Sequence, residues 1–240
     1  MEVNARGEYL SAGQSLESLF RALPELSSVV PEADRPLAER TLTGAVLSAC
    51  DEDLAEVLAS RQPTAFDFII LEGIVFKETT LLSRTALEML GPGDVLAPPL
   101  TAIRQVESRA VSRYVAHGHV ALMTLNDRFR MAAARWPRLA DVLHDRLGQQ
   151  THRASMHLAM LHLPRVEDRL VALFADLGER FGRMTGEGIV VPVPLTHDVI
   201  GRLVGSRRPT VSLALQSLAS EGTLIRRDAD WVLTADAITP

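Results

Sequence analysis

The sequence has a single cysteine, Cys50, among its 240 residues. One thiol cannot form an intramolecular disulfide or supply the four thiolates of an iron–sulfur cluster. We expect Cys50 to be a small buried residue, with a redox-sensing thiol as the alternative. No apolar run approaches the ~20 residues of a membrane-spanning helix, and residues 1–10 lack the apolar core of a signal peptide. We therefore expect a cytoplasmic protein with no membrane partner.

The chain also lacks an excess of positive charge. Its 25 Lys and Arg face 30 Asp and Glu, for a net charge of −5, which argues against a generally basic nucleic-acid coat protein. With 47% hydrophobic and 23% charged residues, the composition is that of a globular protein long enough for two compact domains. We find no nucleophile–base pair, phosphate-binding loop or metal quartet, so we predict no enzyme, cofactor or metal site.

Residues 195–224 carry the most informative pattern, two short helices joined by a tight turn and followed by a hairpin. Thr196 is placed to cap the first helix. Gly201 lets the second helix cross close by, and Gly205 accepts the positive φ that ends the first helix. This is the layout of a winged helix-turn-helix, which places its second helix in the DNA major groove.

The second helix begins with Arg207-Arg208-Pro209, and proline is at home in a first turn. Its arginines occupy the end that reaches bases and phosphates. Between Thr196 and Arg227 five arginines face two acidic residues, a local charge of +3, which suggests modest affinity per subunit and hence a dimer. The alternative is an amphipathic helical hairpin with a solvated polar face. The apolar positions facing the domain core are Val211, Leu215 and Leu218.

Residues 195–218 resemble the DNA-binding signature of the Crp/Fnr family of bacterial transcription regulators. The resemblance implies an α+β fold with an N-terminal β-roll (a cyclic-nucleotide-binding-like jelly roll), a long dimerisation helix and a C-terminal winged helix-turn-helix. It matches Arg208 to an arginine that reads a guanine. It matches Thr196, Arg207 and Thr210 to positions that contact phosphates.

Two departures from the family pattern bear on the operator sequence. A glutamate common after the base-reading arginine is Pro209 here, and a second common arginine is Leu213. We therefore expect an operator that differs from the best-known one of the family. Gln216 is a further candidate for base contacts, and Arg226 either touches phosphate or is a solvated charge. The complete candidate DNA interface is Thr196, His197, Arg207, Arg208, Thr210, Ser212, Gln216 and Arg226.

Residues 1–125 are predicted to form the β domain, because short apolar runs alternate there with turn residues. A short helix is expected at Ser15–Leu23, and Phe66–Phe76 is either two strands or one strand bent around Gly73. The other predicted strands are Thr85–Leu90, Val106–Ala116 and Val120–Leu125, with His117-Gly118-His119 as a turn.

The cyclic-nucleotide motif of the family is incomplete. In the nucleotide binders, a Gly-Glu pair and an Arg-Ser/Thr-Ala follow a turn that corresponds to Gly91–Asp94. Residues 95–100 contain no such arginine, and Arg84-Thr85-Ala86 precedes the turn. Since a cyclic phosphate needs a positively charged partner or a nest of N–H groups, we predict that cyclic AMP is not the effector, which is left unidentified. His117 and His119 lack the further ligands of a metal site.

Residues 126–163 are predicted to be the connecting segment, with Asn126 capping a short helix and a long helix running from Pro137 to about Leu163. Apolar residues at alternating spacings of four and three indicate a coiled-coil homodimer through residues 136–161. The alternative is a helix that packs only on its own β domain. The predicted seam is Trp136, Ala140, Leu143, Leu147, Gln150, Ala154, His157 and Leu161.

Residues 164–240 are predicted to be the DNA-binding domain, after a hinge at Leu163-Pro164. We expect a helix from Pro164 and a loop over Gly182–Gly188. A short edge strand over Ile189–Pro194 and a hairpin of Thr223–Arg226 with Trp231–Thr234 follow.

Together these features predict a homodimeric regulator without catalytic activity that binds palindromic operator DNA and acts on RNA polymerase. The alternative is a ligand or metal sensor whose helix-turn-helix contacts protein instead of DNA.

Overall fold

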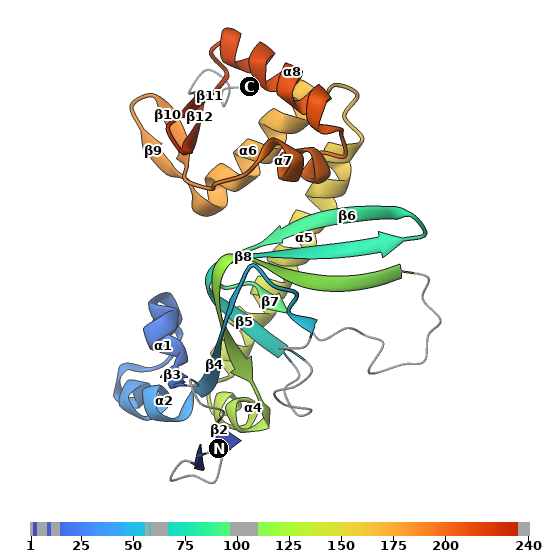
Figure 1. The fold of residues 1–240 in the computed structure, drawn as a ribbon. Coiled ribbons are helices and arrows are strands. Elements are labelled where there is room, and N and C mark those ends of the chain that lie inside the picture. Colours follow the sequence, from blue (N-terminus) through green and yellow to red (C-terminus); the bar gives the residue numbers. More distant parts are fainter. Residues whose placement is uncertain are drawn as a thin grey trace. The chain divides into compact units, whose positions relative to one another are not determined.

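The computed structural model describes residues 2–3, 9–10, 15–55, 58, 67–96 and 110–234. It divides into two compact units, Met1–Thr151 and His152–Pro240. The division falls inside one continuous helix, α5 (Pro137–Leu161), drawn in yellow in Figure 1. The predicted α+β architecture, with strands first and a winged helix-turn-helix last, is confirmed.

The N-terminal unit is built on an antiparallel sheet in the strand order β3-β4-β8-β5-β6, with β7 paired to β5. Side chains from five of these strands form one apolar core, represented by Leu47, Phe68, Leu90, Leu96 and Leu122. The strands are β3 Ser15–Ser18, β4 Thr43–Cys50, β5 Asp67–Leu81, β6 Arg84–Leu90, β7 Val95–Leu96 and β8 Ala110–Leu125. A separate antiparallel pair is β1 Glu2–Val3 with β2 Tyr9–Leu10.

The two long strands β5 and β8 bend where the sequence has glycine. Of the two alternatives for Phe66–Phe76, the single bent strand is correct, because the register of β5 shifts around Gly73, whose φ is +86°. The predicted turn at His117-Gly118-His119 is wrong, because β8 continues through it. The N–H of Gly118 donates to Asp51 Oδ1 at 2.7 Å. Phe66 and residues 106–109, also predicted as strand, lie outside the described residues.

The predicted helix Ser15–Leu23 is wrong in its first half. Residues 15–18 instead pair with β4, and only α1 (Leu19–Ala22) is helical, with Ser18 Oγ accepting from the N–H of Phe20 at 3.3 Å. The hydrogen bonds of residues 15–18 to β4 therefore outweigh the helical sequence pattern of these residues. Among the described residues, the other helices before α5 include η1 Pro24–Val29, η2 Glu32–Asp34, α2 Arg35–Thr41 and α4 Asp127–Ala133.

Cys50 is exposed, so the prediction of a buried thiol is wrong. Burial alternates along β4, and because Ala49 faces inward, Cys50 at the end of the strand faces outward. Within the described part of the chain, no helix combines the length and the hydropathy needed to cross a membrane.

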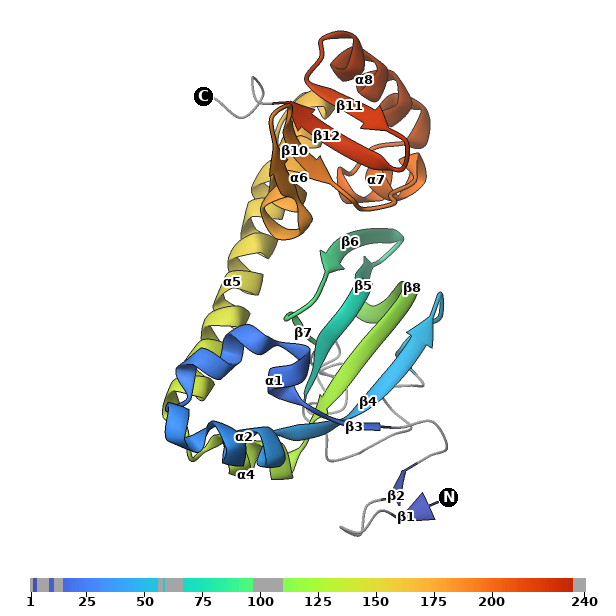
Figure 2. The same ribbon diagram turned by 90° about the vertical axis from the view of Figure 1, so that its left-hand side faces the viewer.

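The N-terminal half of α5 packs against the sheet and helices of its own unit (Figure 2). Trp136 and Leu139 are buried in a second apolar core, and Leu143 packs against it. Gln150 exchanges two hydrogen bonds of 3.3 Å with the backbone of Val95. Three positions of the predicted dimer seam (136, 143 and 150) therefore contact the protein's own β domain.

The C-terminal unit has the helices and small sheet of a winged helix. Its sheet runs in the order β11-β12-β10-β9. The predicted edge strand at Ile189–Pro194 is wrong in its position, because the residues expected to form a loop include β9, which pairs with β10 and makes it an inner strand. The elements are α6 Val166–Phe181, β9 Arg183–Thr185, β10 Gly188–Val191, α7 His197–Leu203, α8 Arg208–Ser220, β11 Leu224–Arg227 and β12 Asp230–Thr234.

Candidate DNA interface

Helix α7 begins where the sequence predicts. Thr196 has an extended backbone, and its Oγ1 accepts a hydrogen bond from the N–H of Val199 at 3.3 Å. Ile200 and Leu203 on the inner face are completely or almost completely buried. The cap and this inner face fix the direction in which α7 enters the domain.

The turn between α7 and α8 depends on two glycines. Gly205 has a φ of +63°, and the N–H of Ser206 returns to the carbonyl of Gly201 at 2.8 Å. A Cβ atom at position 201 would lie 2.8 Å from the carbonyl oxygen of Ser206. The predicted close crossing of the two helices is therefore confirmed.

Gly201→Ala is expected to destabilise the C-terminal unit, although alanine favours helix by ~1 kcal/mol over glycine. The clash is with a backbone oxygen, which cannot rotate away, so we expect a net loss of about 1–3 kcal/mol. Thermal unfolding and hydrogen exchange of the α7 and α8 amides measure it. Gly148→Ala is the matched control, because a Cβ there meets open space and should stabilise α5 slightly. Equal effects of both changes would contradict the packing argument.

Helix α8 has one buried face and one exposed face. Its buried residues are Val211, Ala214, Leu215 and Leu218, of which three were predicted from spacing. Pro209 lies in its first turn, as predicted. The opposite face is exposed, so the helix is free to enter a groove. The exposed residues at the beginning of the helix and on this face are Arg207, Arg208, Pro209, Thr210, Leu213 and Gln216.

A hydrogen-bond chain joins the first turn of α7 to the exposed helix. Ser212 Oγ donates to the carbonyl of Arg208 at 3.0 Å, and His197 Nδ1 lies 2.9 Å from the same hydroxyl. The single hydroxyl hydrogen of Ser212 is donated to the carbonyl of Arg208, so the ring Nδ1–H of His197 is the donor to Ser212 Oγ. The contact spans fifteen positions, so the sequence pattern could not reveal it.

The hairpin after α8 carries two arginines close to its tip at Asp228, which has a φ of +52°. Arg227 forms an ion pair with Glu187 at 2.7 Å. Arg226 lies over the ring of Trp231, 5.0 Å from its centroid, and its Nε donates to the carbonyl of Asp228. Trp231 is in turn buried against Phe174 of α6. The wing therefore presents Arg226 from a rigid base.

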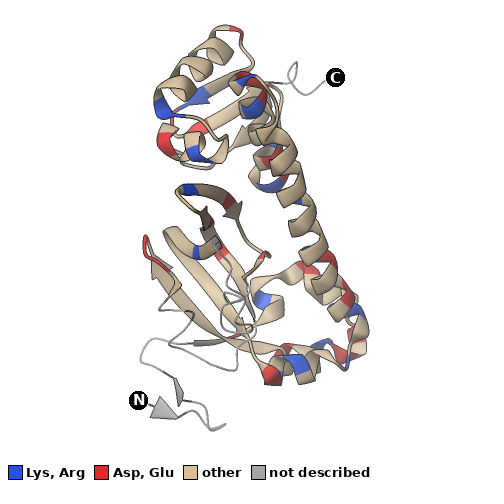
Figure 3. Cartoon of the chain, turned by 90° about the vertical axis from the view of Figure 1, so that its right-hand side faces the viewer, with Lys and Arg blue, Asp and Glu red and all other residues tan. Residues whose placement is uncertain are grey.

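Figure 3 colours Lys and Arg blue and Asp and Glu red along the ribbon. Two of the arginines lie at the beginning of α8, and among the described residues they have no ion-pair partner. Both Arg207 and Arg208 are exposed, and neither is ion-paired with another of the described residues. Arg207 occupies the N-cap position and Arg208 the first helical one. Guanidinium groups in this position are suited to bases and phosphates.

Arg169 of α6 ties the end of α5 to the helix-turn-helix. Its Nε donates to the carbonyl of Leu163 at 2.7 Å, and its Nη1 donates to the carbonyl of Val204 at 3.1 Å. Leu163 follows the end of α5, and Val204 is the C-cap of α7. One guanidinium thus satisfies carbonyls at two helix C-termini, which also favour positive charge. No sequence motif points to this residue.

Thus seven of the eight candidate residues lie on two adjoining helices, and the eighth lies on the wing. Thr196 and His197 begin α7, and Arg226 belongs to β11. The other five, Arg207, Arg208, Thr210, Ser212 and Gln216, lie at the N-cap or within α8.

In the N-terminal unit, Arg84-Thr85-Ala86 is exposed at the beginning of β6, which pairs with β5 directly after a tight turn. Residues 97–100, where the nucleotide motif of the family would continue, lie outside the described residues. Among the residues that are described, no three His, Cys, Asp or Glu side chains are grouped to hold a metal ion.

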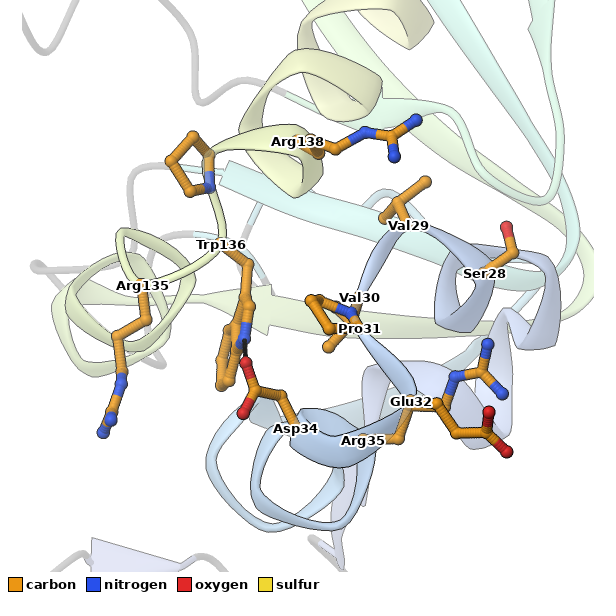
Figure 4. A pocket seen from close by; sticks show the side chains of 11 residues that line it. Ser28, Val29, Val30, Pro31, Glu32, Asp34, Arg35, Arg135, Trp136 and Arg138 are labelled. Atoms are coloured by element: carbon orange, nitrogen blue, oxygen red, sulfur yellow. Dashed lines mark hydrogen bonds between the residues drawn. The ribbon is translucent and has the colours of Figure 1, made fainter.

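A half-open pocket of about 500 Å³ lies between the segment 28–35 and the beginning of α5 (Figure 4). Its wall includes Trp136, whose Nε1 donates to Asp34 Oδ2 at 3.1 Å. Arg35, Arg135 and Arg138 stand at its exposed edge. The pocket is separate from the candidate DNA interface, which belongs to the other unit.

Comparison with known proteins identifies the C-terminal unit. Residues 168–236 match the Crp-like helix-turn-helix domain. The chain is 29% identical over 146 residues to the regulatory protein CysR of Synechococcus elongatus, covering 60% of this chain and 63% of CysR. It is 32% identical over 111 residues to the CRP-like cAMP-activated global transcriptional regulator of Mycobacterium tuberculosis, covering 46% of this chain and 49% of that protein. The match thus spans less than two thirds of either relative.

The fold is also found among solved structures. A cyclic nucleotide-binding domain containing protein from Listeria monocytogenes superimposes with a TM-score of 0.67 at 16% identity, covering 91% of this chain and all of that one. The fold and the exposed α8 define a winged helix-turn-helix protein with an N-terminal β domain. The match of residues 168–236 to the Crp-like helix-turn-helix domain confirms the resemblance to the Crp/Fnr family predicted from residues 195–218.

Proposed function

We propose that the protein is a transcription regulator that binds a palindromic operator in double-stranded DNA as a homodimer. The observation that carries the proposal is the pair of exposed, unpaired arginines at the beginning of α8, on a helix whose other face is buried. Residues 164–240 would bind DNA, residues 126–163 would join two subunits, and residues 1–125 would act as the sensor-like domain. Bacterial DNA lies in the cytoplasm, so the proposal places the protein there.

Each candidate residue has a role in this proposal. Arg208 reads a base edge, the pairing being bidentate to guanine O6 and N7. Thr196, Arg207 and Thr210 contact phosphates and fix the register. His197 and Ser212 hold the N-terminal part of α8 against α7 through their hydrogen bond. Gln216 reaches a second base, and Arg226 contacts the backbone from the wing.

The face of α5 that does not pack on the β domain supports a dimer whose seam differs from the predicted one at three positions, each replaced by the next residue along the helix. Four residues of the predicted seam stay in place, because they alternate along α5 with exposed residues on the same face of the helix. They are Ala140, Leu147, Ala154 and Leu161. Leu147 is 43% exposed and Leu158 is 62% exposed. His144, Thr151 and Leu158 take the places of Leu143, Gln150 and His157, which preserves the alternating spacing.

The β domain would receive an effector other than cyclic AMP, because Arg84 precedes the turn at Gly91–Asp94 and is exposed at the beginning of β6. RNA polymerase is the proposed further partner, as expected for a regulator of transcription. The proposal assigns no catalytic step to the protein.

A fluorescence-anisotropy titration tests the function. The full-length protein, without ligand, is titrated against the DNA upstream of its own coding sequence and against random-sequence DNA of equal length. We expect tighter binding to the upstream DNA by at least tenfold, with affinity falling steeply as salt rises. Equal binding to both DNAs at every salt concentration, in the absence and presence of cyclic nucleotides, would contradict sequence-specific regulation.

A further inference from the structure

We propose that Leu213 determines part of the operator sequence by contacting the 5-methyl group of a thymine in the major groove. This inference rests on the proposed DNA binding and extends it to a residue outside the candidate interface. Leu213 is 68% exposed, near the middle of a helix whose opposite face is well buried.

Leu213 lies on the face of α8 that is turned away from the domain. Because an α-helix turns by about 100° per residue, Pro209, Leu213 and Gln216 lie within about 60° of one another, and the buried residues lie opposite. Arg208 begins the helix and lies about 80° from Gln216, on the side of the sector away from Leu213. Leu213 lies about 60° from Gln216, so a groove that receives Gln216 also receives Leu213.

The chemistry of the side chain limits what it can recognise. Leucine has no donor or acceptor, so contact with a base edge that carries only polar groups would remove water from those groups without replacing their hydrogen bonds. Thymine presents the one apolar group of the unmodified major groove, its 5-methyl. Pro209, one turn before Leu213 and also exposed, extends the apolar strip toward Arg208. A thymine is therefore expected beside the base pair that Arg208 reads.

The alternative occupant of an exposed leucine is another protein. Against it, Leu213 is flanked on α8 by polar residues, with the half-buried Ser212 before it and the exposed Gln216 after it. Large apolar side chains gathered in one patch would favour a protein interface. A single leucine within a polar, arginine-bounded face fits a base edge better.

The test replaces thymine by uracil, which differs from it only in lacking the methyl group. A duplex is first selected from random-sequence DNA by the full-length protein, and each thymine of one half-site is then replaced singly by uracil. We expect one position, or two adjacent ones, to lose about fourfold in affinity, and about fifteenfold when both half-sites are changed. Leu213→Ala should abolish this methyl dependence, whereas Gln216→Ala, on the same exposed face, should leave it intact.

The outcomes separate the inference from the function on which it rests. If the selected duplex binds no better than random DNA, the proposed function and the inference both fail. If it binds specifically and no uracil substitution weakens binding, or if Leu213→Ala retains the methyl dependence, the inference alone is overturned. Since Leu213 is exposed, its replacement should leave the unfolding temperature unchanged, which circular dichroism verifies.

Discussion

Arg208→Ala is expected to weaken operator binding by about 1–3 kcal/mol per half-site and to relax specificity at one base pair. The reason is that Arg208 is exposed at the first position of α8 and has no ion-pair partner among the described residues. Its donors are therefore available to two acceptors of a guanine edge. The measurement is anisotropy with the selected duplex and with its variants at each base pair, at two salt concentrations.

Two comparison variants make the result specific to Arg208. Arg207→Ala should reduce affinity similarly for all sequences and lower the salt slope by about one, because a phosphate contact carries no sequence information. Arg138→Ala removes an exposed arginine from the other unit and should change neither property. If Arg208→Ala lost affinity uniformly across sequences, Arg208 would be a phosphate contact instead.

Leu158→Glu is expected to separate the proposed dimer and to reduce operator affinity by about 10²–10⁴-fold, because the second half-site would no longer bind intramolecularly. Leu158 is exposed on α5 on the same side as Leu147, and a glutamate there would place like charges opposite each other in the seam. Sedimentation at several protein concentrations measures the oligomeric state, and anisotropy measures the affinity.

Met131→Glu is the matched control, because Met131 is 76% exposed and belongs to α4, outside the proposed seam on α5. It makes the same chemical change without touching the seam and should leave a dimer with normal affinity. If Leu158→Glu remained dimeric while His157→Glu dissociated, the seam predicted from sequence would stand in place of the shifted one.

The helix-turn-helix was predictable because its signals are local. Thr196, Gly201, Gly205 and Pro209 each meet a backbone requirement within a few residues, and the structure confirms all four. The buried stripe of α8 follows from helical spacing in the same way. Once the beginning of α8 is placed, the positions of Arg207 and Arg208 at its exposed N-terminal end follow directly.

Features that depend on residues distant in sequence were not predictable. The pairing of residues 15–18 with β4 depends on a partner more than twenty positions away, and it overrides a helical pattern. Gly118 indicates an interruption of regular structure. Because β8 pairs with β4 and β5 around this residue, the interruption is a bend within one strand and not a turn between two strands. The face of α5 that packs inward depends on contacts such as Gln150 with Val95. Periodicity alone placed that residue in the dimer seam.

The contacts of Arg169 bear on the separation of the two half-sites that a bound dimer would contact. By linking Leu163 to Val204, Arg169 fastens the last turn of α5 to the same body that carries α8. Leu158 belongs to that body as well. Two copies joined at Leu158 would thus fix the separation of their α8 helices through the pairing of the C-terminal units. The rotational phase of the two half-sites on the duplex would then follow from that pairing.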